Sequence, residues 1–366
     1  MKTYGLSAGK LQLRSIGPIT FGPDGILFVA DNSAAAIVAI EVEAASRTDV
    51  AAPPVEVVGV TSRLAAYLGA SRDDVLIRGM AVHPVSRAIF LSVMRGRGNE
   101  AVPVLVRVLP TGDLEAVDFE NVPFATTAVD DAPSPEDART DVWLDGMNGP
   151  GEERESAGIR LHIARPRLRT STVTDLAYSD GVLFVAGASN EEFASTLRRI
   201  PFPFTNSRTS TPLEIFHVSH GKYETAAPIK ALVLYDDDSS VLASYLCTPV
   251  VHFDVDELKD KSLARGRTVA ELGARNQPLD MVSYRHAGEE YFLISNTLHP
   301  LIKLPSAPIR TEEALNGTED SVGVPREELD HPGVHWMANL GDEYILMMQR
   351  DRDEEYNLRA YSTASL

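Results

Sequence analysis

The chain has 366 residues, of which 44% are hydrophobic and 23% are charged, and its 34 basic and 52 acidic side chains give a formal net charge of −18. This apolar fraction excludes wholesale disorder, and so acidic a surface repels phosphate backbones and anionic lipid, so nucleic acid and membrane are not expected partners. The single cysteine, Cys247, excludes an internal disulfide and a zinc site built from several cysteines.

An internal repeat organises the chain. Each unit has a short apolar strand, a tight turn, a second apolar strand and a polar break. In the first unit these are residues 17–21, 22–25, 26–30 and 31–33, and a third strand follows at 37–40. The other five strand pairs are 79–82 with 88–91, 175–178 with 182–186, 231–234 with 241–244, 280–283 with 291–294, and 336–339 with 344–348.

The spacing of these units indicates blades of a β-propeller. With Pro18, Gly79, Asp175, Ala231, Asp280 and Trp336 taken as equivalent, the steps are 61, 96, 56, 49 and 56 residues. Four of the five steps are near ~50 residues, the span of a four-stranded blade with its loops. The first two strands of each unit are almost wholly apolar, which is typical of strands buried between neighbouring sheets. Outer strands are expected at 55–58, 213–216 and 269–272.

A propeller ring must close, because open sheet edges pair with other chains. The last unit ends with a third strand at 356–361 and lacks an outer strand, while an unassigned strand, 10–14, precedes the first unit. Pairing these two segments would complete the last blade. The sequence therefore predicts an all-β, six-bladed β-propeller, a single domain over residues 1–366, closed by an N-terminal strand in the last blade. This strand pattern resembles the six-bladed propellers of the NHL-repeat, gluconolactonase and paraoxonase superfamily.

The long step of 96 residues is explained by an insertion. Residues 119–170 are acidic and rich in Pro and Gly, which is the composition of loops. We expect this insertion to lie over one face of the ring. The alternative is a degenerate seventh blade that uses 122–124 and 161–163.

Propeller topology sorts side chains onto faces. Residues just before the first strand and just after the second strand of each unit share one mouth of the central channel, and the hairpin turns lie on the opposite face. The mouth residues that we expect to bind a ligand are polar, basic or aromatic: Arg78, Arg95, Arg97, Asn190, Lys230 and Trp336. Their positive charge favours an anionic small molecule or an acidic peptide.

The same mouth could hold a metal. Asp175, Asp280, Asn32 and Asn296 supply the carboxylate and amide oxygens that a hard divalent cation requires. The family resemblance implies a calcium ion at this position in the hydrolytic members, and His335 would then be the candidate general base. The alternative is that these residues make buried hydrogen bonds and ion pairs between blades.

Three other residues need comment. Cys247 ends a second strand, so it is either a nucleophile with His252 or His299 as its base, or a buried apolar side chain. His217 and His220 follow one strand, and a metal there would need further ligands.

The function expected from these observations is a binding platform for a small anionic ligand or a protein partner. The alternatives are a calcium-assisted hydrolase of the lactonase or arylesterase type and a structural subunit of a complex. Residues 1–14 lack the apolar core of a secretory signal. The expected location is therefore cytoplasmic as written, or periplasmic or secreted if a signal was removed.

Overall fold

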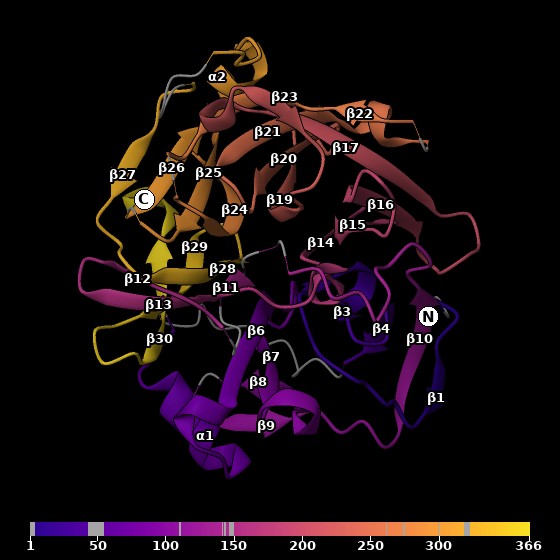
Figure 1. Cartoon of the computed structure of the whole chain (residues 1–366). Coiled ribbons are helices and arrows are strands. Elements are labelled where there is room, and N and C mark those ends of the chain that lie inside the picture. The colour runs from indigo at the N-terminus through magenta and orange to yellow at the C-terminus, as the bar shows by residue number, and fades with distance from the viewer. Residues whose placement is uncertain are drawn as a thin grey trace.

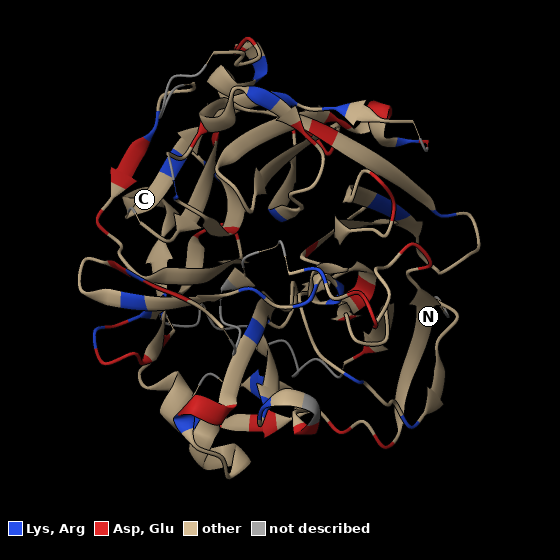
Figure 2. Cartoon of the chain, viewed as in Figure 1, with Lys and Arg blue, Asp and Glu red and all other residues tan. Residues whose placement is uncertain are grey.

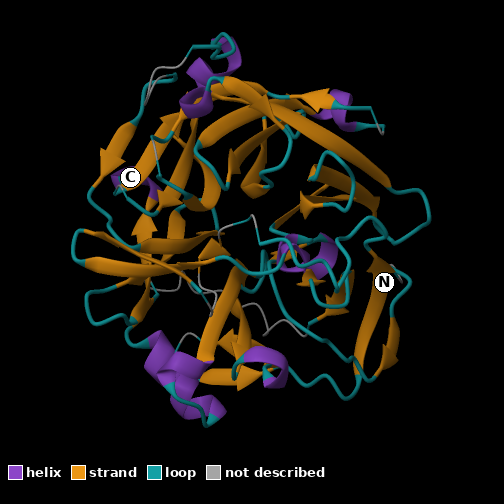
Figure 3. Cartoon of the chain, in the orientation of Figure 1, coloured by secondary structure: helices purple, strands orange, loops and turns teal. Residues whose placement is uncertain are grey.

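The structure is a computed structural model, and it describes residues 4–366 with the exception of 43–54, 110, 141, 143, 146–149, 261, 274, 299 and 318–322. The fold is a ring of six antiparallel sheets around a central axis (Figure 1). Strands make up most of its regular structure, and the two α-helices of the described residues lie at the periphery (Figure 3). The all-β, six-bladed propeller expected from the sequence is confirmed.

We number the blades by the order of their inner strands in the chain. The first contains β2 (Ile19–Phe21), β3 (Ile26–Asp31), β4 (Ala36–Glu41), β10 (Val122–Ala128) and β1 (Ser7–Gly9). The second contains β6 (Val75–Val82), β7 (Ile89–Arg95), β8 (Val102–Val108) and β9 (Leu114–Ala116). The third contains β14 (Asp175–Ser179), β15 (Val182–Ala188), β16 (Ser195–Pro201), β17 (Thr209–His217) and β18 (Lys222–Glu224), and β22 (Ala264–Arg265) pairs with β17.

The remaining blades have four strands each. The fourth contains β19 (Ile229–Tyr235), β20 (Ser240–Tyr245), β21 (Pro249–Asp254) and β23 (Arg267–Glu271). The fifth contains β24 (Pro278–His286), β25 (Glu289–Asn296), β26 (Leu301–Pro305) and β27 (Glu327–Leu329). The sixth contains β28 (Val334–Leu340), β29 (Tyr344–Arg350), β30 (Tyr356–Ser362) and β5 (Glu56–Val57).

The second strands of the blades are buried on both faces, as their apolar composition predicts. All six residues of β3 and all six of β20 are buried. Each lies in a sheet that packs against neighbouring sheets, and removing this much apolar surface from water is the main force that holds the ring together.

The order of the blades around the ring differs from their order in the chain. The innermost strand β6 contacts β28 on one side and β2 on the other, and β2 in turn contacts β14. The first blade therefore lies between the second and third blades, while the second blade contacts the sixth (Figure 1). The chain makes the inner strands of the first blade, crosses to build the second blade, and returns as β10 to complete the first.

The prediction that residues 10–14 close the ring was wrong, although another strand from the N-terminal part of the chain does complete the last blade. That strand is β5, in which Val57 lies opposite Leu358 of β30. Residues 10–14 instead follow β1 along the first blade, where the backbone N–H of Leu11 donates to the carbonyl of Phe119 at 2.8 Å. Leu11 is buried in the core of the first two blades, next to the strand β1 that pairs with β10. Residues 55–58 were correctly expected to be an outer strand.

Residues 129–174 connect β10 to the third blade and carry a small separate sheet of β11 (Leu144–Asp145), β13 (Ile159–Ala164) and β12 (Gly151–Ser156). Its hairpin crosses in front of the ring (Figure 1). Arg154 donates to the backbone carbonyl of Arg275, and Ser156 donates to that of Leu298, so the hairpin is fastened to the loops of the fifth blade. Residues 122–124 belong to the first blade and 159–164 to this small sheet, so they do not form a seventh blade.

In the described part of the chain, two α-helices lie outside the blades: α1 (Val60–Leu68) and α2 (Ser306–Thr311). Among the described residues, no helix has the length and apolar character needed to cross a membrane. Several aspartates in the turns adopt positive φ, a conformation that aspartate tolerates better than most residues: Asp24, Asp180, Asp236, Asp237 and Asp238.

Candidate functional site

The inner strands of all six blades line a central cavity of about 620 Å³. Arg78, Asp175, Lys230, Asp280 and Trp336 all line it, so five of the predicted mouth residues are brought together. Basic positions on β6 and at the start of β19 border the centre of the ring (Figure 2). A much smaller cavity, of about 30 Å³, is lined by Leu144 of β11 together with Arg78, Lys230 and Trp336.

Asp175 and Asp280 hold neighbouring blades together. Asp175 accepts hydrogen bonds from the backbone N–H groups of Leu176 in its own blade and Leu232 in the next, at 2.8 and 2.7 Å. Asp280 does the same with Met281 and Met337, at 2.8 and 2.6 Å. Each carboxyl thus satisfies two buried donors and ties one inner strand to the next.

Burial governs the protonation of both carboxyls. It raises the pKa of Asp175 to about 6, against the lowering effect of its two backbone donors and of Lys230. Burial, with the nearby charge of Asp175, raises the pKa of Asp280 to about 7. The positive charge of Lys230 acts in the opposite direction and favours the ionised form of both carboxyls.

We expect Asp280→Asn to change how stability depends on pH. The folded-state pKa lies above the ordinary value of 3.8, so the folded protein binds this proton more tightly than the unfolded chain. The contribution of Asp280 to stability is then fully present below about pH 4 and is lost as the pH rises through about 7. The stability of the wild type relative to Asp280→Asn should fall by at least about 1.4 kcal/mol between about pH 5 and pH 8, measured by urea denaturation.

The matched control is Asp237→Asn, in an exposed hairpin turn with 94% side-chain exposure. The difference in free energy of unfolding between Asp237→Asn and the wild type should not change over the same pH range. A constant difference for Asp280→Asn as well would show that this carboxyl is not the buried proton-binding group.

The other two predicted metal ligands, Asn32 and Asn296, do not line the central cavity. The Asn32 side chain donates to the backbone carbonyls of Thr170 and Val173 and accepts from the N–H of Val173. Asn296 donates to the carbonyls of Ile294 and Pro300 and accepts from the N–H of Leu298, within its own loop. Both amides are thus engaged with backbone groups.

A second cavity, of about 260 Å³, lies between the first two blades and is bordered by Arg78, Arg97 and Arg169; we call it the arginine pocket. Ile16, Leu76 and Met94 give it an apolar part, and Ser15, Ser33 and Thr170 give it hydroxyl groups. Arg78 sits at a β-bulge in β6, between Ile77 and Gly79, and it lines both this pocket and the central cavity. Bulges are a common means of redirecting a side chain toward a site.

Arg169 was not predicted as a site residue. It belongs to the short helical turn Leu168–Ser171 at the end of the segment that carries the small sheet. Its guanidinium donates to the backbone carbonyls of Asn32, Pro133 and Ser33 at 2.9, 2.6 and 3.1 Å. Burial lowers the pKa of Arg169, which still remains charged because an arginine pKa starts so high. The carbonyls fix the guanidinium without neutralising its charge.

Arg97 lies on the opposite side of the pocket. Its Nε is 2.8 Å from a carboxylate oxygen of Asp74, and its side chain is 54% exposed. Exposed pairs of this kind contribute little to stability, so Arg97 can be replaced with little effect on folding.

The other predicted site residues are elsewhere. Arg95 and Asn190 are exposed, and neither lines the central cavity or the arginine pocket. His335 is buried, with Nδ1 2.8 Å from the Tyr356 hydroxyl and its ring stacked on Trp336 at 4.1 Å. His335 borders a third cavity of about 410 Å³, beside the β13 strand, rather than the central one.

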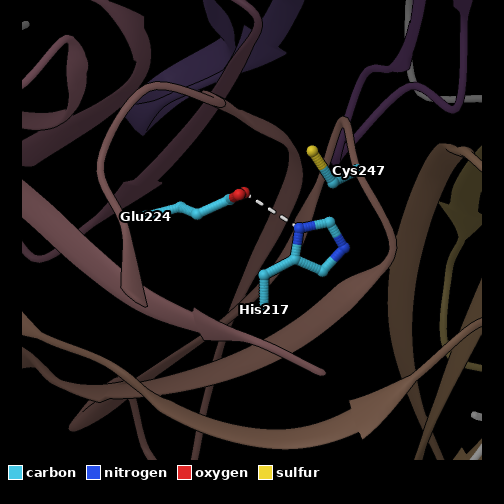
Figure 4. A group of neighbouring side chains, drawn as sticks. All are labelled: His217, Glu224 and Cys247. Carbon is cyan, nitrogen blue, oxygen red and sulfur yellow. Dashed lines mark hydrogen bonds and ion pairs between the residues drawn. The ribbon is translucent and has the colours of Figure 1, made fainter. Parts of the chain in front are cut away.

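Cys247 lies in a cluster whose other members the sequence did not connect to it. Its neighbours are His217 and Glu224, and the ligand atoms of all three lie within 4.8 Å of one another (Figure 4). Burial, with the carboxyls of Glu224 and Glu271, raises the pKa of the thiol to about 12, so the nucleophile expected from the sequence would be a neutral thiol. One expected base, His252, bonds instead to Tyr235 and Asp254, and the other, His299, lies outside the described residues.

No known protein-family model matches the chain, and no curated protein sequence matches it. Among solved structures, the chain is similar to a streptogramin B lyase, with 9% identity, a TM-score of 0.39 and coverage of 98% of this chain and 97% of the other. It is also similar to virginiamycin B lyase from Staphylococcus aureus, with 11% identity, a TM-score of 0.38 and coverage of 97% and 99%. A third similarity is to the Cps50 (Swd1) β-propeller domain of Myceliophteria thermophila, with 12% identity, a TM-score of 0.40 and coverage of 95% and 84%.

Proposed function

We propose that the protein binds a small organic anion in the arginine pocket. The observation that carries the proposal is the convergence of Arg78, Arg97 and Arg169 from three separate segments on one cavity. Among the described residues that line it, none is acidic. On a chain with a net charge of −18, a local group of cations focuses an anion on that site.

The shape and lining of the pocket narrow the class of ligand. At about 260 Å³ it is at the lower end of the size of small-molecule sites, so it favours a small molecule over an acidic peptide. Arginine forks recognise carboxylate or phosphate groups, and Ile16, Leu76 and Met94 suit a short apolar body. We therefore favour an organic acid over inorganic phosphate.

The test is isothermal titration calorimetry with benzoate and with inorganic phosphate. We expect benzoate to bind more tightly than phosphate, and Arg97→Gln and Arg78→Gln each to weaken benzoate binding about tenfold or more, because each removes a charge-assisted hydrogen bond. The matched control is Arg359→Gln, which removes an arginine of similar exposure, 48%, from a surface pair with Glu56.

The outcomes separate the possible sites. If Arg359→Gln weakened benzoate binding as much as Arg97→Gln, the overall charge of the protein, and not the pocket, would attract the anion. If Arg95→Gln weakened benzoate binding and Arg97→Gln did not, the anion would bind at the exposed loop after β7 instead of in the arginine pocket. Absence of benzoate and phosphate binding to the wild type would contradict the proposal.

A calcium-assisted hydrolase receives less support from the geometry, because the side-chain amides of Asn32 and Asn296 bond to backbone groups and neither residue lines the central cavity. The two carboxyls that border the central cavity already accept two backbone N–H groups each. We therefore place the ligand site at the arginines.

A further inference from the structure

The third and fourth blades bring a cysteine, a histidine and a glutamate together. His217 is the last residue of β17, the helical turn Val218–His220 follows, and the chain reverses at Gly221 into β18, which ends at Glu224. Cys247 lies between β20 and β21 of the neighbouring fourth blade. Since these strands end on the same face of the ring, the three side chains converge from two blades (Figure 4).

The spacing of the ligand atoms is close to that of a metal centre. The Cys247 Sγ, one ring nitrogen of His217 and one carboxylate oxygen of Glu224 lie within 4.8 Å of one another. In a tetrahedral zinc site, bonds of about 2.0–2.3 Å place neighbouring ligand atoms roughly 3.5 Å apart. Changes in side-chain torsions that shift these atoms by about 1 Å are therefore enough to hold an ion.

The surrounding groups already hold two of the three side chains in place. His217 is 3% exposed; its Nδ1 is 2.9 Å from Glu224 Oε2, and its Nε2 is 3.1 Å from Thr248 Oγ1. The other oxygen of Glu224, Oε1, is 2.6 Å from His220 Nδ1. A metal-bound histidine commonly donates its second N–H to an oxygen, and a metal-bound carboxylate is commonly hydrogen-bonded in turn.

We propose that Cys247 Sγ, His217 Nδ1 and a carboxylate oxygen of Glu224 bind one Zn²⁺ ion, with water as the fourth ligand. The Cys247 thiol gives its proton to solvent as the Zn–S bond forms, so one proton is released from the thiol for each ion bound. The ion replaces the Nδ1–Glu224 hydrogen bond, and the imidazole proton moves to Nε2, from which it is donated to the Thr248 hydroxyl.

The choice of zinc follows from the set of ligands. A thiolate and an imidazole select a borderline or soft ion over magnesium or calcium, and one carboxylate completes a set that zinc accepts in four-coordinate geometry. Cys247 is partly exposed and the His220 side chain is 51% exposed, so an ion can enter from solvent. The site is separate from the arginine pocket and does not depend on the proposed function.

The test is titration of the metal-free protein with Co²⁺, followed by displacement with Zn²⁺. We expect one Co²⁺ per chain with a thiolate-to-cobalt charge-transfer absorption in the near ultraviolet, and loss of that absorption when Zn²⁺ is added. Cys247→Ser, which keeps the size of the side chain, should abolish the absorption. His217→Ala should weaken Zn²⁺ binding by about 100-fold or more and Thr248→Val by about tenfold, measured by competition with a chromophoric chelator.

The matched control is His162→Ala, which removes another histidine that lies 2.6 Å from a glutamate, Glu153, on the surface. It should leave the absorption and the affinity unchanged. Circular dichroism and thermal melting establish whether each variant is folded. If His217→Ala does not fold, the absorption of Cys247→Ser alone decides whether the thiolate binds the ion. A wild type without the absorption, or an absorption that survives in Cys247→Ser, would overturn the proposal.

Discussion

Replacing Arg198 with alanine is expected to lower the free energy of unfolding by about 3–5 kcal/mol, the usual cost of removing one partner from a buried ion pair. Arg198 lies in β16 with only 4% of its side chain exposed, and its Nε is 2.6 Å from Asp131 Oδ1. Its two terminal nitrogens donate to the carbonyls of Thr172 and Ala188, each at 2.9 Å. Alanine would leave a carboxylate and two carbonyls without these partners. Urea denaturation followed by fluorescence measures the change.

The same variant should weaken the anion site. Asp131 and Thr172 lie near the two ends of the segment between β10 and β14, and that segment carries Arg169. Losing Arg198 therefore releases the segment from the third blade, and benzoate binding should weaken in the Arg198→Ala variant under conditions where it is still folded.

The matched control is the neighbouring residue, Arg199→Ala. Its guanidinium lies over the ring of Phe184, 5.5 Å from the centroid, an interaction worth about 1 kcal/mol. In a double-mutant cycle, Arg198→Ala with Asp131→Ala should cost less than the sum of the two single changes. A cost below about 1 kcal/mol for Arg198→Ala would contradict the view that Arg198 anchors this segment.

Leu358→Ala is expected to destabilise the protein by about 2–5 kcal/mol, because it opens a cavity in a packed core. Leu358 is fully buried in the cluster shared by the second and sixth blades, where it lies opposite Val57 of the closing strand β5. The loss loosens the sheet that closes the ring. Thermal and urea denaturation both report it.

A second cycle tests which segment closes the ring. Val57→Ala and Leu358→Ala should show a coupling energy of about 0.5 kcal/mol or more, since the two residues are cross-strand partners. Leu11→Ala should be additive with Leu358→Ala, because Leu11 is buried in a different cluster, that of the first two blades. If Leu11 and not Val57 showed a coupling energy with Leu358, residues 10–14 would close the ring, as first expected from the sequence.

The sequence was sufficient to predict the inner strands and their burial. An apolar pair such as β3 with β2, joined by a turn that contains Asp24 and Gly25, can be identified from local pattern alone. Strand order also predicted that Arg78 precedes a first strand and Arg97 follows a second one, and both residues line the arginine pocket.

The pairing of outer strands could not be predicted in the same way. β5 has only two residues, and its partner β30 lies about 300 residues further along the chain. Residues 10–14 have an equally suitable pattern, and the return of β10 to the first blade depends on contacts between whole blades. Nothing local distinguishes these choices.

In the candidate sites, too, some residues could be predicted from the local sequence pattern and others depend on contacts between distant segments. Arg169 lies in a segment of loop composition, and it joins Arg78 and Arg97 only because its guanidinium is held by backbone carbonyls of the first blade and of residue 133. His217 and Cys247 are 30 positions apart. A usable signal was present for this pair, since each ends a strand on the same face in neighbouring blades, but Glu224 depends on the turn at Gly221.

The central claim is that Arg78, Arg97 and Arg169 form an anion site between the first two blades. Crystals soaked in sodium bromide and measured at the bromine absorption edge test it most directly. The account predicts an anomalous peak within the arginine pocket, in contact with these guanidinium groups. Bromide bound only at exposed arginines such as Arg359, with the pocket empty, would contradict it.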